Sequence, residues 1–134
     1  MTNKREGKQV STEEQGIARP PRVFIINEPL KKDLETGELE PFLPMESAAN
    51  FGDVVKVTPD GSPPGNLKPY LAMLREKLAD FREEDYLVLV GDQALLVAAA
   101  AIVGTSETGK LRVLKWERRL NAYAPLVLDT GEPQ

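Results

Sequence analysis

Residues 53 to 116 predict a strand, a helix, a strand, a second helix and a third strand in turn, and this order constrains the fold more than any other feature. A strand–helix–strand unit joins parallel strands, because the helix returns the chain across one face of the sheet. Two such crossovers in succession predict an α/β fold. We expect a small mixed sheet with two βαβ-type crossovers and antiparallel hairpins at its edges.

The two helices of these crossovers differ in character. The first is amphipathic, because its apolar residues recur at steps of four and three, at Leu67, Leu71, Leu74, Leu78 and Phe81. The second spans residues 93 to 103 and contains ALLVAAAAIV, a ten-residue apolar run that is followed directly by Gly104. That run is about half the length of a bilayer crossing and is typical of a buried helix.

Strands and hairpins complete the predicted sheet. VFIIN at residues 23 to 27 and YLVLV at 86 to 90 are apolar runs typical of buried strands. Thr36 and Gly37 supply the turn of a short hairpin, and residues 111 to 116 and 123 to 129 predict a closing hairpin.

A chain of 134 residues fits one domain. Residues 1–21 are polar and without periodicity, so we expect a flexible arm there, a single α/β domain over 22–130 and a short tail over 131–134. The amino-terminal residues lack the apolar segment of a secretory signal, and we expect a cytoplasmic protein without membrane contact.

The chain contains no cysteine and no histidine. Disulfides, thiolate nucleophiles and Cys-ligated zinc are therefore excluded, and the side chain most used for proton transfer near neutral pH is missing. No phosphate-binding loop or dinucleotide fingerprint is present, so we expect no cofactor.

Charge is distributed unevenly along the chain. The net charge is -4, which argues against general binding to polyanions. Residues 110 to 119 nevertheless contain five cations and one acid, and residues 1 to 22 contain five cations and three acids. The sequence therefore predicts a local basic patch on an acidic body.

The stretch KLRVLKWERRLNAY at residues 110–123 combines this charge with aromatic rings. Cations beside exposed rings can contact phosphates and stack bases. The candidate nucleic-acid-binding residues are Lys110, Arg112, Lys115, Trp116, Arg118, Arg119 and Tyr123. Alternatively, Leu114 and Trp116 pack on the core while arginine stems cover them and cations protect a sheet edge.

Acidic residues offer a weaker site. Asp92 follows a strand and begins a helix, where it is either a metal ligand or general base, or simply the N-cap of the helix. Glu83, Glu84 and Asp85 are consecutive, and we expect all three to be solvated.

The order of several blocks resembles a group of small proteins of tailed bacteriophages over residues 22 to 129. The blocks are FIINEPL, DLETGELEPF, GDVVKV, LREKLADFREEDYLVLVGD and LRVLKWERRLNAYAPLVLD. This chain departs from the group with Gln93 in place of proline and Glu117 in place of aspartate. The resemblance implies a virus-encoded protein acting in the host cytoplasm, and it implies no catalytic residues.

Three hypotheses follow. The first is a phage-encoded, non-enzymatic protein that binds single-stranded or structured nucleic acid through residues 110–123. The second is a protein–protein module, either a homodimer or an inhibitor that uses its acidic body on a host protein. The third is a metal-dependent enzyme centred on Asp92.

Overall fold

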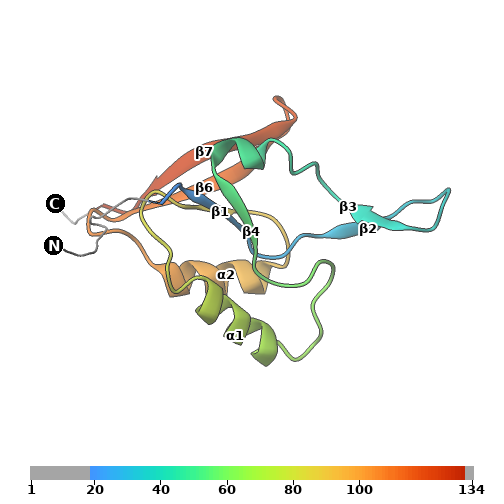
Figure 1. Ribbon diagram of the computed structural model, residues 1–134, viewed down its shortest axis with the longest axis horizontal. Helices are drawn as coiled ribbons and strands as arrows, with labels where there is room; N and C mark the ends of the chain where they lie inside the picture. Colours follow the sequence, from blue (N-terminus) through green and yellow to red (C-terminus); the bar gives the residue numbers. More distant parts are fainter. Residues whose placement is uncertain (1–18, 132–134) are drawn as a thin grey trace, which may run out of the picture.

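The computed structural model describes residues 19–131, which fold around a five-stranded sheet of order β4-β1-β5-β6-β7 (Figure 1). The strands are β1 (Arg22–Ile25), β4 (Asp53–Lys56), β5 (Tyr86–Val88), β6 (Lys110–Glu117) and β7 (Ala122–Asp129). Strands β4, β1, β5 and β6 are parallel, and β7 is antiparallel to β6. The predicted α/β class with a mixed sheet is confirmed.

Each face of the sheet has its own core. Helices α1 (Lys68–Lys77) and α2 (Gln93–Val103) pack on one face with Phe24, Leu87 and Val113. The other face carries Val23, Ile25 and Leu114 under the short 3-10 helix η2 (Ala48–Phe51). Alternation along a strand explains the division, because successive side chains of β1 point to opposite faces. A fully buried leucine or isoleucine stabilises such a core by about 1.5–3 kcal/mol.

The first hairpin does not join this sheet. Strands β2 (Leu30–Lys32) and β3 (Leu39–Pro41) pair with each other in a separate two-stranded sheet. This hairpin projects away from the layers of the domain (Figure 1). From here on, the arm means residues 30–41 and not the amino-terminal residues 1–21.

Helix α2 is less buried than its sequence predicts. Only Leu95 and Ala99 are buried, whereas Val97 and Ala101 are exposed. The helix lies in an outer layer, so only the side toward the sheet is covered. Its exposed residues are Gln93, Ala94, Val97, Ala101 and Ile102, so the outer side is largely apolar. Among the described residues, no helix, α1 and α2 included, is long and apolar enough to cross a membrane.

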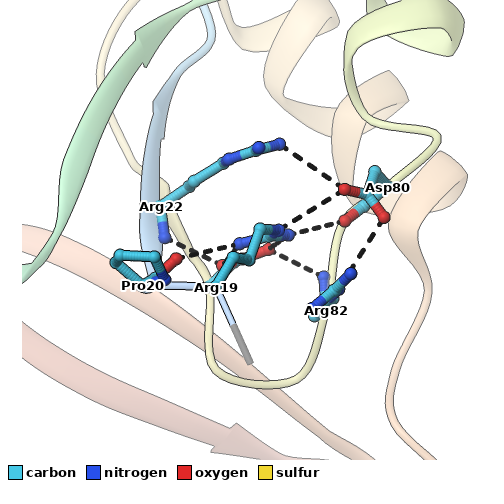
Figure 2. Close-up of polar contacts among 6 residues, drawn as sticks. Arg19, Pro20, Arg22, Asp80 and Arg82 are labelled. Carbon is cyan, nitrogen blue, oxygen red and sulfur yellow. Dashed lines mark hydrogen bonds and ion pairs between the residues drawn. The ribbon is translucent and has the colours of Figure 1, made fainter. Parts of the chain in front are cut away.

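The buried carboxylate of Asp85 ties the amino end of β1 to the loop before β5. Figure 2 shows its partners Arg19, Arg22 and Arg82 beside Asp80. Asp85 is 0% exposed, and its two oxygens accept hydrogen bonds of 2.9 and 2.6 Å from the guanidinium of Arg19. The backbone N–H groups of Arg22 and Arg82 donate to the same carboxylate at 2.8 Å each. The expectation that Asp85 is solvated like its neighbours is wrong, because these four donors replace water around it.

These contacts determine the protonation of Asp85. Burial acts to raise the pKa of Asp85, but the hydrogen bond from Arg19 and those from the backbone of Arg22 and Arg82 outweigh it and hold the pKa below its usual value. A lowered pKa means that the native state binds this proton more weakly than the unfolded chain does. The stabilisation is therefore present above about pH 4 and is lost as the pH falls through the lowered pKa.

We expect Asp85→Asn to lower the free energy of unfolding by about 3 kcal/mol, because it leaves the guanidinium of Arg19 without its buried counter-charge. Urea unfolding between pH 3 and pH 7 measures this loss, and the acid-dependent part of the wild-type curve should shrink in the variant. Asp80→Asn is the matched control, since the exposed Asp80 pairs with the same Arg19 and should contribute less than about 1 kcal/mol. Equal losses in the two variants would contradict the role given to Asp85.

Candidate functional site

The predicted basic and aromatic residues lie on the hairpin formed by β6 and β7. The two strands pair in register from Lys110 opposite Asp129 to Glu117 opposite Ala122. Residues 118–121 form the turn, and Asn121 has a positive φ of 52°, which asparagine tolerates better than most residues. The hairpin predicted from the sequence is therefore present.

Strand alternation separates the five cations. Arg112 and Trp116 point to the face of the sheet that carries η2, and Lys115 points to the helix face. Arg118 and Arg119 are exposed in the turn. Lys110 lies at the opposite end of β6, roughly 26 Å from Arg118 at about 3.3 Å per residue. The structure thus brings Lys115, Trp116, Arg118 and Arg119 together at the tip of the hairpin, and leaves Lys110 and Arg112 along its length.

None of these five cations forms an ion pair with any residue between 19 and 131. Some other cations among residues 19–131 form ion pairs within the fold, whereas Lys32, Lys68, Arg75 and Lys77 do not. Arg19, Arg22 and Arg82 pair with Asp80 or Asp85, and Lys56 pairs with Glu28 and Asp60. The tip of the hairpin therefore presents positive charge that the described part of the fold does not neutralise.

Trp116 and Tyr123 face each other across the hairpin. Their ring centroids are 5.1 Å apart in an edge-to-face arrangement at 77°. Tyr123 is only 3% exposed and its backbone N–H donates to the Oγ of Ser47 at 2.9 Å, whereas Trp116 is half-buried against the same core. The buried ring of Tyr123 packs against the indole of Trp116, and the indole retains contact with solvent.

The hydroxyl of Tyr123 is buried without a hydrogen-bond partner among the described residues. Burial, followed by the nearby negative charge of Glu28, raises the pKa of Tyr123 to about 12. An unsatisfied buried hydroxyl costs roughly 1–3 kcal/mol, so this group destabilises the fold.

We expect Tyr123→Phe to raise the free energy of unfolding by about 1 kcal/mol, because it removes the unsatisfied hydroxyl and keeps the ring against Trp116. Denaturant unfolding followed by the fluorescence of the single tryptophan measures the change. Tyr86→Phe is the control, and it should change stability by less than Tyr123→Phe because its hydroxyl is not an unsatisfied buried group. Destabilisation by Tyr123→Phe would show that the hydroxyl has a partner.

A second feature is a cleft of about 930 Å³ at the carboxyl ends of β1, β4 and β5. The segment after β1 passes to the face that carries η2, while α2 follows β5 onto the other face. Open α/β sheets bind ligands at such a switch point.

Asn27 holds the strand ends around this cleft together. Its side-chain nitrogen donates to the carbonyl oxygens of Pro59 and Gly61, at 3.2 and 2.9 Å, and its side-chain oxygen accepts from the N–H of Asp92 at 3.0 Å. Gly91 packs against the same residue, and a Cβ there would overlap the carbonyl oxygen of Asn27. No local pattern predicts this role, since Asn27 is an ordinary residue at the end of an apolar run.

The residues between 19 and 131 that line the cleft are mainly apolar and include no lysine or arginine. The arm and the chain after it contribute Leu30, Phe42 and Leu43, and α2 contributes Leu96. Such a surface suits uncharged or apolar groups and does not suit phosphates.

Asp92 lies at the edge of the cleft as the N-cap of α2. Its Oδ1 accepts a hydrogen bond from the N–H of Ala94 at 3.2 Å, which confirms the capping alternative. Residues 19–131 contain no group of three or more acidic side chains that could hold a metal ion.

The block order quoted above is matched by a family model. The model described as "Phage Pam3 gp32-like protein" matches residues 21–130, which is most of the chain. No curated protein and no solved structure matches the chain. The resemblance to small phage proteins is confirmed at the level of the family. By its residues 21–130, the chain belongs to the phage Pam3 gp32-like family.

Proposed function

We propose that this phage protein is a non-enzymatic binding protein that contacts single-stranded or structured nucleic acid through the tip of the β6–β7 hairpin. The observation that carries the proposal is the set of exposed cations at the tip, Lys115, Arg118 and Arg119, which have no acidic partner among the described residues. Such cations bind phosphates by releasing counterions.

The residues have different roles in this proposal. Arg118 and Arg119 contact phosphates, and Lys115 adds charge from the helix face. Trp116 stacks on an unpaired base with its solvent-facing side, and Tyr123 fixes the indole in place. Arg112 and Lys110 lie along β6 and extend the contact with a longer strand. The amino-terminal segment over residues 1–21, which the sequence predicts to be flexible, lies mostly outside the described residues.

We expect labelled single-stranded DNA and RNA oligomers to bind at low salt, with affinity falling as salt rises. Three to five neutralised phosphates predict a slope of log K against log[salt] of about -2 to -3.5. Fluorescence anisotropy measures the affinity, and quenching of the single tryptophan reports stacking on Trp116.

The variant Arg118→Glu with Arg119→Glu should abolish this binding. The control is Lys68→Glu with Arg75→Glu, which changes the net charge equally at exposed positions of α1. Equal loss in both variants would mean that overall charge, not the hairpin, controls binding. Absence of binding by the wild-type protein at low salt would reject the proposal.

A protein–protein module is the second candidate, and the arm favours it. Leu34, Leu39 and Phe42 are exposed on or beside a hairpin that projects from the domain (Figure 1). Exposed apolar residues on one projecting element are typical of a contact with a protein. A homodimer and a host protein remain the two partners that this candidate allows. An enzyme centred on Asp92 has no such support, because its carboxylate caps α2.

A further inference from the structure

We infer that two copies of this chain pair through the outer edge of β7 and form one continuous sheet. The inference is independent of nucleic-acid binding and concerns the end of the hairpin away from its tip. It begins with exposure: Leu126, Val127 and Leu128 are 43%, 48% and 40% exposed on consecutive positions of an edge strand. Edge strands with apolar side chains are ready templates for pairing with another strand.

The backbone of β7 has a defined outer edge. The carbonyl of Leu114 accepts from Leu89 and so points toward β5. Since Leu114 is opposite Pro125, the backbone groups of Pro125 must point away from β6. By the same alternation, the backbone N–H and C=O groups of Tyr123, Val127 and Asp129 also point away from β6. The hydrogen bond from the backbone N–H of Tyr123 to Ser47 is consistent with this direction.

Only part of this edge can form hydrogen bonds with a second strand. Ser47 covers the position of Tyr123, and Pro125 has no N–H to offer. Val127 and Asp129 contribute outward N–H groups, and the carbonyls of Pro125 and Val127 contribute outward acceptors. Among residues 19–131, no side chain or backbone group outside β6 covers this stretch with a hydrogen bond. The open stretch therefore runs from Pro125 to Asp129.

A two-fold axis beside Val127 makes this stretch complementary to itself. In an antiparallel pair, Val127 exchanges both bonds with Val127 of the second copy, and the N–H of Asp129 meets the carbonyl of Pro125. Pro125 contributes only its carbonyl in this register, so each pair of Pro125 with Asp129 forms one hydrogen bond instead of two.

Side chains select the same register. Leu126 is then opposite Leu128 of the second copy on the helix face, where their partners in β6 are Val113 and Leu111. Four leucines meet across the axis on the helix face of the sheet. A second copy is favoured over another partner because one short stretch supplies matching donors, acceptors and apolar side chains.

The contact is small. A single strand pair falls below the roughly 1,200 Å² of a standard stable interface, so we expect a dimer with a dissociation constant on the order of micromolar. Sedimentation equilibrium of the full chain should show a concentration-dependent monomer–dimer exchange.

The variant Val127→Pro tests the edge directly. It removes one outward N–H from each copy and leaves the bonds between β6 and β7 intact, as Pro125 already does. We expect the dissociation constant to rise by about tenfold or more, because two symmetry-related hydrogen bonds are lost. Val127→Thr keeps the N–H and the branched side chain and should dimerise like the wild type. Unchanged far-ultraviolet circular dichroism shows that Val127→Pro still folds.

The register has its own test, because the chain contains no native cysteine. An equal mixture of Leu126→Cys and Leu128→Cys proteins should form the mixed disulfide faster than either protein links to itself. Monomers at every concentration, or a dimer that Val127→Pro leaves unchanged, would overturn the inference. Faster self-linking of Leu128→Cys would overturn the register.

Discussion

The buried pair of Arg19 and Asp85 is the interaction on which the position of the central strand depends. One carboxylate binds the segment before β1, the first N–H of β1 and the loop that leads into β5. The strand β1 pairs with both β4 and β5, so fixing its amino end aligns three strands at once. At the other end, Asn27 connects the same strand to the loops after β4 and β5. Two polar side chains thus hold the middle of the sheet at its two ends, while apolar packing holds it across its two faces.

Much of the fold could be predicted because its signals are local. Helix α2 spans the predicted residues 93–103, since an aspartate at its start and Gly104 at its end both mark the helix by short-range chemistry. The order of strands and helices predicted parallel pairing for the same reason. Asp85 could not be predicted, because the partner that buries it lies 66 residues away and its neighbours Glu83 and Glu84 are exposed. The burial of α2 was overestimated because ALLVAAAAIV contains no polar residue to mark which side of the helix faces water.

The candidate site shows the same division. Alternation along β6 separates Leu111 and Val113 from Leu114 and Trp116, as the two cores show. It could not show that Tyr123 is buried by η2, which depends on a contact between Ser47 and the outer edge of β7. Nor could it show that the arm leaves the sheet and forms one wall of a cleft. Contacts between segments far apart in sequence decide which residues of a pattern stay accessible.

The close approach of Gly91 to Asn27 has a consequence for variation among sequences of this fold. Any side chain at position 91 would push apart the ends of β1 and β5, because it would overlap a backbone carbonyl that cannot rotate away. The backbone conformation at this position, with a φ of 108°, also favours glycine. In the loop after β4, Gly61 also has a positive φ of 91° and its carbonyl accepts from Asn27, whereas the neighbouring cleft residues Ser62, Pro63 and Pro64 have no positive φ. A lineage could therefore change those cleft residues more readily than the junction between the two central strands. The strand ends at the base of the cleft are therefore constrained, while residues of its walls can vary.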